Sequence, residues 1–358
     1  MKEFLRRGSP YIMISEIHEQ PAVAHRVISS DEWIYKRASE MILESDKIII
    51  TGSGSSYHAG LFLDMALKRI SLNSYPVVSS EHESIIEHVG EESVIIAISQ
   101  SGFTKDTLEA VKKFKEKGGR IIAVTNAIES PLSKSSDHVI YVEAGREEAV
   151  TATKSFTGQV VSLMRVYSIL LHQLGRDDES FDEELRKLPS LLREHINKAE
   201  IQVREIVDLI YRRENAYILG RGFNYVAALE SALKIKETCG VHAEALPMAE
   251  IRHGPKSAIN ESYIVSAMIG LKDDIEILGR IIEEIRDSGS HVIIVSPERY
   301  LDLLPREGWI SHITRVDTNS EIIGALMNIV VFQLFSYYIA VSRLLDPDYP
   351  RRLGKIVF

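Results

Sequence analysis

The sequence contains almost no cysteine, since Cys239 is the only one in 358 residues. A single cysteine excludes an intrachain disulfide and also a cysteine-rich zinc or iron–sulfur site. The first residues, Met1 to Arg7, carry charges but are not followed by the apolar stretch of a secretion signal. Without a disulfide framework or a secretion signal, the expected compartment is the cytosol.

An excess of positive charge is missing as well. Lys and Arg number 42 against 51 Asp and Glu, which gives a net charge of −9 and argues against a sequence-independent hold on nucleic acid phosphates. The longest apolar stretch, residues 322–345, is interrupted by polar residues such as Asn328 and Gln333, which favours a buried core helix over a membrane span. We therefore expect neither a nucleic acid nor a membrane as a partner.

What the sequence does contain is a repeated strand–loop–helix pattern. From Lys47, a β-branched run ends in a Gly/Ser turn, and apolar residues then recur at helical spacing. The segments 93–119 and 118–126 predict a second strand with its helix and a third strand. Strands that are apolar on both faces and alternate with helices indicate a parallel sheet covered on both sides.

The same pattern recurs about 170 residues later. The segment from Asn215 has Gly220 and Gly222 where the first copy has Gly52 and Gly54. The segments 262–270 and 288–297 correspond to the second and third strands of the first copy. The sequence therefore predicts an α/β fold with two similar doubly wound parallel-sheet subdomains.

These patterns divide the chain into five segments. We predict an N-terminal helical segment (1–45), a first subdomain (46–165), a helical connector (166–213), a second subdomain (214–345) and a basic C-terminal tail (346–358). The connector interleaves acidic and basic residues, and no segment is of low complexity.

Two loops of the first subdomain are rich in hydroxyl groups, residues 51–56 and 99–104. Both follow strands and precede helices, so their backbone N–H groups and the positive helix ends can face an anion. Turn formation, with Thr104 as a simple N-cap, is the alternative for either loop alone. Two such loops on adjacent strands favour phosphate binding. A dinucleotide fold fits less well, because Tyr57 stands at the third position of the partial GxGxxG motif.

A third hydroxyl-rich loop, residues 147–157, also precedes a predicted helix, and helix capping explains it well.

In the second subdomain, Glu230, Lys234 and Glu237 are spaced i, i+4 and i+7, which places them on one helix face. Such charges often form a solvated stripe. The mostly apolar neighbours here predict burial instead, and a carboxylate beside a lysine in apolar surroundings suits general-base catalysis.

Four further titratable residues follow this helix. His242, Glu244, Glu250 and His253 lie close together in sequence, but no HExxH spacing is present and we expect no metal. His253 stands at a turn after a helix, where an imidazole can act as an acid near neutral pH. Lys355 lies in the tail and by its position alone would be a solvated, inert lysine.

These motifs together resemble the SIS-domain (sugar isomerase) family. The resemblance is strongest to the isomerase domain of glucosamine-6-phosphate synthase and to related aminosugar-phosphate deaminases. It extends from Glu16 to the C-terminus and rests on SGSSYHAG, SQSGFTKDT, ATKSFT, LESALKIKE, HAEA, EIRHGP and DPDYPRRLGK. No cofactor is expected.

The resemblance implies roles for individual residues. The 6-phosphate of a sugar would be held by Ser56, Ser99, Gln100, Ser101 and Thr104, and the sugar would be lined by Ser55 and Val150. Glu237 would move a proton between C1 and C2, supported by Lys234 and Glu230. His253, from a neighbouring subunit, would open the sugar ring, which implies a homodimer. Lys355 would form a Schiff base with the open-chain ketose, an iminium that acidifies the adjacent C–H.

Three departures from the synthase pattern bear on substrate and reaction. Phe103 replaces an acidic residue, and Ala152 replaces a serine that touches the sugar. The chain begins MKEFLRR and has no cysteine before Cys239, so we expect that it does not make ammonia from glutamine itself.

We therefore predict an aminosugar-6-phosphate deaminase/isomerase that converts glucosamine 6-phosphate and water into fructose 6-phosphate and ammonia. One alternative is the reverse reaction, using free ammonia or a separate glutaminase subunit as partner. Another is a non-catalytic sugar-phosphate-binding regulatory module, although such a sensor would need only the phosphate loops. The sugar epimer and the physiological direction stay open at this point.

Overall fold

The computed structural model describes residues 11–355 and contains two compact units. The first-sheet unit comprises residues 20–147, 154–189 and 354–355. The second-sheet unit comprises residues 11–19, 148–153 and 190–353. The outermost parts of the predicted segments 1–45 and 346–358 lie outside the described residues, and the five predicted segment boundaries stay predictions.

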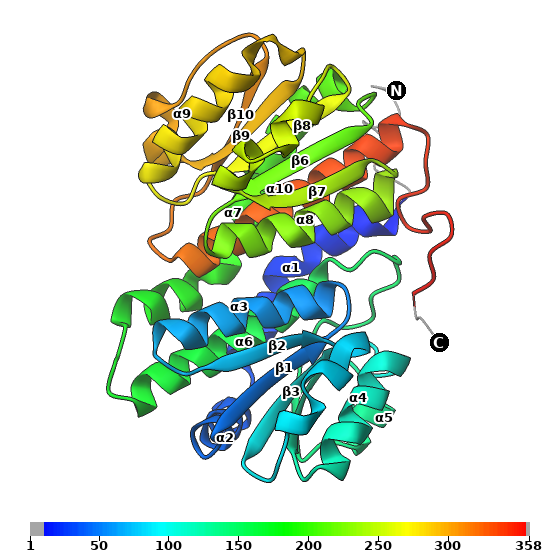
Figure 1. Cartoon of the computed structure of the whole chain (residues 1–358), viewed down its shortest axis with the longest axis vertical. Helices are drawn as coiled ribbons and strands as arrows, with labels where there is room; N and C mark the ends of the chain where they lie inside the picture. Colours follow the sequence, from blue (N-terminus) through cyan, green and yellow to red (C-terminus); the bar gives the residue numbers. More distant parts are fainter. Residues whose placement is uncertain (1–10, 356–358) are drawn as a thin grey trace. The chain divides into compact units, whose positions relative to one another are not determined.

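The first-sheet unit contains a five-stranded parallel sheet in the order β2-β1-β3-β4-β5. Figure 1 shows α4 and α5 on one face of this sheet and α3 and α6 on the other. The strands are β1 (Lys47–Gly52), β2 (Ser74–Val78), β3 (Ser93–Ser99), β4 (Arg120–Thr125) and β5 (His138–Tyr141). The α-helices are α2 (Glu32–Leu43), α3 (Ser55–Arg69), α4 (Lys105–Glu116), α5 (Pro131–Lys134) and α6 (Lys154–Gln173), and the 3-10 helices are η1 (Ser79–Ser84) and η2 (Ile86–His88).

Burial explains why these segments form the sheet. Ile49, Ile95 and Ile121 are fully buried and pack against Val111 and Phe114 of α4. Every residue of β3 is buried, as expected for a central strand covered on both faces. Two further helices, α1 (Ile12–Ser29) and α7 (Glu179–Ile210), each contribute residues to both units.

The second-sheet unit contains a parallel sheet in the order β10-β9-β8-β6-β7. One face packs against α9, and α8 and α10 belong to the opposite face (Figure 1). The strands are β6 (Asn215–Gly220), β7 (His242–Pro247), β8 (Tyr263–Met268), β9 (His291–Pro297) and β10 (Ile310–Arg315). The α-helices are α8 (Phe223–Cys239), α9 (Asp273–Ile285) and α10 (Glu321–Ser342), and the 3-10 helices are η3 (Met248–Arg252), η4 (Pro255–Ala258), η5 (Arg286–Ser288) and η6 (Glu298–Leu303).

The long apolar stretch near the C-terminus forms α10. Among the described residues, this helix alone is long and apolar enough to cross a membrane, but its apolar window is 100% buried inside the protein. The predicted core helix is therefore confirmed. It covers the sheet of its own unit through residues such as Phe332, Phe335 and Ile339.

The two units repeat the same local turn after their first strand. Gly54 precedes α3 with φ 56° and ψ −128°, and Gly222 precedes α8 with φ 59° and ψ −131°. Both conformations lie at positive φ, which favours glycine. The preceding Gly52 and Gly220 leave room for the helix, since a Cβ atom would lie 2.9 Å and 2.1 Å from its backbone. The fold of two similar α/β subdomains is confirmed.

The start of α1 is capped from the far end of the sequence. Both carboxylate oxygens of the buried Asp348 accept backbone hydrogen bonds, from Ile12 at 2.8 Å and from Met13 at 2.7 Å. The backbone carbonyl of Asp348 accepts a third hydrogen bond, at 2.9 Å, from the N–H of Val150. All four residues belong to the second-sheet unit, and they anchor the base of the C-terminal tail.

Candidate functional site

The loop 99–104 joins β3 to α4 and forms a compact hydroxyl cluster. The hydroxyls of Ser99 and Thr104 lie 3.0 Å apart, and Ser99 Oγ accepts a hydrogen bond from the Gly102 N–H at 3.1 Å. Ser101 Oγ accepts one from the Phe103 N–H at 3.2 Å. Thr104 occupies the N-cap position of α4, but its side chain makes no capping bond. Its hydroxyl is thus turned to the loop rather than to the helix.

Only glycine fits at one position of this loop. Gly102 has φ 66°, and an added Cβ would lie 2.1 Å from Ser130 Oγ. The adjacent Gln100 carbonyl accepts the Asn126 N–H at 3.0 Å, which ties the loop to the end of β4. Phe103, the departure from the synthase pattern, is 45% exposed. A rigid loop that presents several hydroxyls before a helix N-terminus suits an oxyanion.

The second hydroxyl loop joins β1 to α3 in the same unit. Ser56 is buried in the first turn of α3, and its Oγ accepts a hydrogen bond from Gln159 Nε2 at 3.1 Å. Ser55 begins α3 and is half-buried. Because β1 and β3 are parallel neighbours, the two loops begin at the same end of the sheet, where the carboxyl ends of the strands lie. Both loops therefore follow the carboxyl ends of neighbouring strands and precede helices, and their role in phosphate binding stays a prediction.

Thr51, the first residue of the loop 51–56, is linked to two buried hydroxyls, those of Ser79 and Thr107, that the loop pattern did not single out. Thr51, the last but one residue of β1, lies 3.1 Å from Ser79 through their hydroxyls, and Ser79 lies 3.0 Å from the Thr107 hydroxyl. All three are buried. This chain of hydroxyls links β1, η1 and α4, and it fixes the elements from which the loops depart.

The loop before α6 holds a charged pair that the sequence pattern did not indicate. Glu147 has a fully buried side chain, and its Oε2 lies 2.8 Å from Lys355 Nζ. The same carboxylate accepts hydrogen bonds from the N–H and the hydroxyl of Ser155, at 3.1 Å and 2.7 Å. The expected capping of α6 is therefore present, and the carboxylate that provides it also pairs with Lys355. Both residues of the ion pair belong to the first-sheet unit.

In the second-sheet unit, α8 brings Glu230, Lys234 and Glu237 together. Lys234 Nζ lies 2.7 Å from Glu237 Oε2 and 3.3 Å from Glu230 Oε1. The side chains of Lys234 and Glu230 are 1% and 0% exposed, whereas that of Glu237 is 23% exposed. The three residues are a buried cluster rather than a solvated stripe, and within it Glu237 reaches the surface.

The electrostatics of this cluster favour a charged lysine. Burial on its own lowers the pKa of Lys234, but the carboxylates of Glu230 and Glu237 outweigh that effect and raise the pKa above its ordinary value. Lys234 is therefore an ammonium at neutral pH. Its charge orients the Glu237 carboxylate through a short hydrogen bond, which leaves Lys234 in a positioning role.

The remaining predicted residues lie outside these clusters. His253 follows η3 as its C-cap residue, is exposed, and donates its backbone N–H to the Glu250 carbonyl at 2.9 Å. Between residues 11 and 355, no hydrogen bond or ion pair joins its side chain to the triad on α8. Val150 lies in the loop that Asp348 anchors, and the next residue, Thr151, lies 3.2 Å from Thr238 of α8 through their hydroxyls.

Residues 242–253 form β7, η3 and a turn, not a metal cage. Within the described part of the chain, no group of three or more His, Cys, Asp or Glu side chains is arranged to hold a metal ion. His242 and Glu244 both lie on β7 and are exposed.

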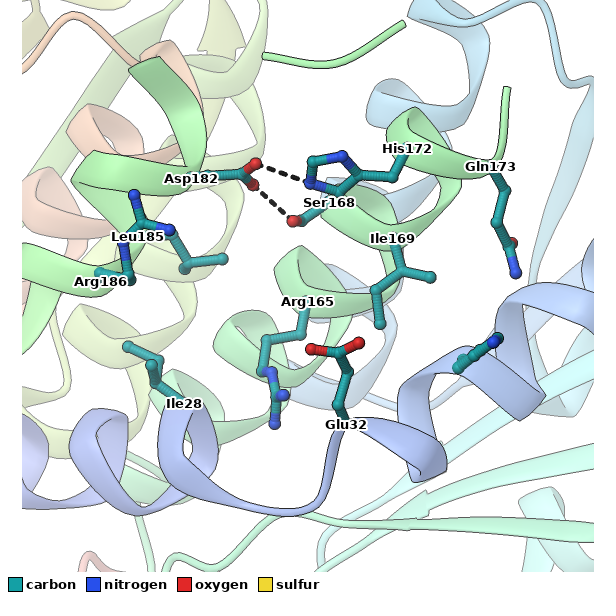
Figure 2. A pocket seen from close by; sticks show the side chains of 11 residues that line it. Ile28, Glu32, Arg165, Ser168, Ile169, His172, Gln173, Asp182, Leu185 and Arg186 are labelled. Atoms are coloured by element: carbon teal, nitrogen blue, oxygen red, sulfur yellow. Dashed lines mark hydrogen bonds and ion pairs between the residues drawn. The ribbon is translucent and has the colours of Figure 1, made fainter. Parts of the chain in front are cut away.

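A cavity of about 470 Å³ lies elsewhere in the first-sheet unit, beside α2, α6 and α7. Figure 2 shows His172 and Ser168 directed at the carboxylate of Asp182, at 2.7 Å and 2.5 Å. Arg165 donates to the backbone carbonyls of Val27 and Ser30. None of the predicted site residues lines this cavity. The polar groups of Ser168, His172, Asp182 and Arg165 bind one another or backbone carbonyls, and cavity volume alone does not mark the site.

Comparison with known proteins adds to this geometry. The SIS domain matches residues 41–168 and 209–343. Glutamine–fructose-6-phosphate aminotransferase (isomerizing) from Pyrobaculum aerophilum is 36% identical over 351 residues, covering 98% of this chain and 58% of that protein. Two solved structures superpose over 96% of this chain and 99% of theirs. They are the C-terminal domain of glucosamine-fructose-6-phosphate aminotransferase from Francisella tularensis (TM-score 0.86, 26% identity) and glucosamine-6-phosphate deaminase from Thermotoga maritima (TM-score 0.79, 24% identity).

These similarities differ in what they establish. The likeness to the deaminase, at 24% identity, concerns the fold alone. The chain spans less than two thirds of the length of the curated relatives it matches. The two SIS matches together cover more than half of the sequence and coincide with the two sheets. The chain belongs to the SIS-domain family.

Proposed function

We propose that this protein is an aldose–ketose isomerase that acts on aminosugar 6-phosphates and releases ammonia. The reaction is glucosamine 6-phosphate plus water to fructose 6-phosphate plus ammonia. The observation that carries the proposal is the triad on α8. A fully buried lysine there holds one partly exposed carboxylate, Glu237, by a 2.7 Å hydrogen bond. A fixed carboxylate with one accessible side is what proton transfer at a sugar carbon requires.

The proposal assigns the steps as follows. The loop hydroxyls of Ser99, Ser101 and Thr104 bind the 6-phosphate, and His253 protonates the ring oxygen as the ring opens. Glu237 removes the proton from C2 of the open-chain aldehyde and returns a proton to C1. The C2 amine loses one N–H proton and becomes an imine, while O1 gains a proton and C1 becomes an alcohol carbon. Water then adds to the imine carbon and ammonia leaves. The oxygen of that water becomes the ketone oxygen of fructose 6-phosphate.

The roles of Lys234 and Glu230 follow from their burial. Neither side chain is accessible enough to touch a sugar, so both act through Glu237. An ammonium that stays charged stabilises the Glu237 carboxylate and fixes the direction of its free oxygen. Burying three charged side chains costs desolvation free energy, which their mutual hydrogen bonds must offset. A non-catalytic sensor that only binds a phosphate has no use for such a cluster.

The synthetic direction is a second candidate. The curated relative from Pyrobaculum aerophilum, at 36% identity, is named a glutamine–fructose-6-phosphate aminotransferase, and this chain spans 58% of it. In this direction the same residues would use fructose 6-phosphate with ammonia, supplied free or by a separate glutaminase subunit. The homodimer and the cytosolic location expected from the sequence also stay proposals.

The test is ammonia release from glucosamine 6-phosphate, compared with glucosamine 6-phosphate formation from fructose 6-phosphate plus ammonium. Glu237→Gln keeps the side-chain shape but cannot accept a proton, so turnover is expected to fall about 10²–10⁴-fold while sugar-phosphate binding persists. Glu283→Gln, at an exposed carboxylate of α9, is the matched control and is expected to turn over normally. A Glu237→Gln protein with unchanged turnover would contradict the isomerase proposal.

A further inference from the structure

The buried carboxylate of Glu147 requires an explanation beyond helix capping. A cap at the start of α6 needs only a hydrogen-bond acceptor, which a neutral glutamine also supplies. A carboxylate with a 0% exposed side chain is costly to bury unless a cation and further hydrogen bonds compensate its charge. The 2.8 Å contact with Lys355 Nζ provides this compensation, from a residue 208 positions away in the sequence.

We infer that Glu147 is the positioning residue for Lys355: it holds the ammonium before substrate arrives and serves as counter-ion to the cationic Schiff base formed afterwards. This inference rests on the proposed function, in which an open-chain ketose phosphate is substrate or product. It concerns the covalent role of the tail lysine, which the triad on α8 does not determine.

The geometry fits a fixed counter-ion. Ser155 donates its N–H to one oxygen of Glu147 and its hydroxyl to the other, so the first turn of α6 holds the carboxylate at both oxygens. Lys355 is different, because its side chain remains 27% exposed. The ion pair thus joins a rigid buried anion to a cation with one open side, where a carbonyl carbon can approach.

The covalent step balances with these two residues and water. Lys355 passes a proton to Glu147, and the free amine forms a bond to the ketose carbonyl carbon as the C=O π bond breaks and an N–H proton moves to the carbonyl oxygen. The resulting carbinolamine takes the proton back from Glu147 and loses water, which leaves a protonated imine on Lys355. The lysine nitrogen carries one positive charge at the start and at the end, when Glu147 is a carboxylate, and both groups are neutral at the carbinolamine stage.

The test traps the Schiff base with cyanoborohydride at saturating fructose 6-phosphate, between pH 6 and 9. Intact-mass measurement and peptide mapping then report the adduct. We expect one sugar phosphate on Lys355 in the full-length wild type and none in Lys355→Arg, because a guanidinium stays protonated. In Glu147→Gln the protonated imine loses its counter-ion, so the pH of half-maximal trapping is expected to fall by about one unit or more.

The control separates this role from structural support. Ser155→Ala removes the hydroxyl contact to Glu147 but leaves the charge on Lys355 compensated. It is expected to lower the melting temperature while the pH of half-maximal trapping stays at the wild-type value. If Glu147→Gln does not fold, Glu147→Asp is measured instead. That variant keeps the charge and is expected to trap less adduct at an unchanged pH midpoint.

Three results would overturn the inference. The first is an unchanged pH midpoint in Glu147→Gln, and the second is a shifted midpoint in Glu147→Asp. The third is a wild-type protein that releases ammonia from glucosamine 6-phosphate but forms no adduct on Lys355, which leaves the proposed function standing. A folded wild type that neither releases ammonia nor interconverts the sugars would instead refute the proposed function itself.

Discussion

Replacing Lys234 by methionine tests the energetics of the triad on α8. The substitution keeps the length and apolar stem of the side chain but removes the ammonium that lies 2.7 Å from Glu237 and 3.3 Å from Glu230. Glu230 then has a wholly buried carboxylate beside an apolar group. Glu237 is better placed to recover water, since 23% of its side chain is exposed.

The expected loss is large because only one partner of a buried set is removed. Breaking a buried ion pair in this way costs about 3–5 kcal/mol, most of it the desolvation of the charge left behind. For a folding unit of about 150–250 residues, each kcal/mol of stability corresponds to about 2–4 °C of melting temperature. Lys234→Met is therefore expected to melt about 6–20 °C below the wild type.

Thermal unfolding followed by circular dichroism measures this difference. The matched control is Lys236→Met, at an exposed lysine of the same helix, which is expected to change stability by no more than about 0.5 kcal/mol. The double variant Glu230→Gln/Lys234→Met removes the stranded charge as well and is expected to recover part of the loss. Equal melting temperatures for Lys234→Met and Lys236→Met would refute the view that this cluster is buried and coupled.

Two further predictions concern the first-sheet unit. Ser101→Ala and Thr104→Ala are each expected to raise KM about 10- to 160-fold with kcat little changed, from about 1.5–3 kcal/mol per hydrogen bond lost to a charged phosphate; unchanged KM values would exclude this loop as the phosphate site. Hydrogen bonding to Asp177, with further support from Asp182, raises the pKa of His172. The stability that the protonated imidazole adds is therefore full below about pH 6.5 and is lost as pH rises through the higher folded pKa. His172→Gln should accordingly lower the melting temperature at pH 6 but not at pH 9, and an equal loss at both pH values would contradict this.

The strands that the sequence predicts are the central ones of each sheet. The segments from Lys47 and Asn215 and their successors correspond to β1, β3, β4, β6, β8 and β9. The four strands without a clear signal, β2, β5, β7 and β10, are the four sheet edges. An edge strand has one side without a neighbouring strand and is less buried, so β7 has one buried residue, Ala243, while β3 is buried throughout. The apolar run that marks a central strand is therefore weak at an edge.

The site residues also divide into those that a local pattern predicts and those that only the tertiary fold brings together. Glu230, Lys234 and Glu237 lie within two helical turns, so their shared face follows from helix geometry alone. The pairing of Lys355 with Glu147 depends on how the tail returns to the loop before α6, which no local pattern encodes. Position in the tail suggested an inert lysine, and its partner is a buried carboxylate in a loop where capping seemed a sufficient explanation.

The capping of α1 by Asp348 has a consequence for the order of events during protein synthesis. Ile12 leaves the ribosome 336 residues before the aspartate that accepts its N–H. At about 5–20 residues per second, the first turn of this helix waits roughly 17–70 seconds for its cap. For most of that interval the second-sheet unit also lacks α10, so the apolar face that α10 covers stays uncovered. The growing chain therefore depends on Asp348 to complete the first turn of α1, and chaperones have that interval in which to bind it.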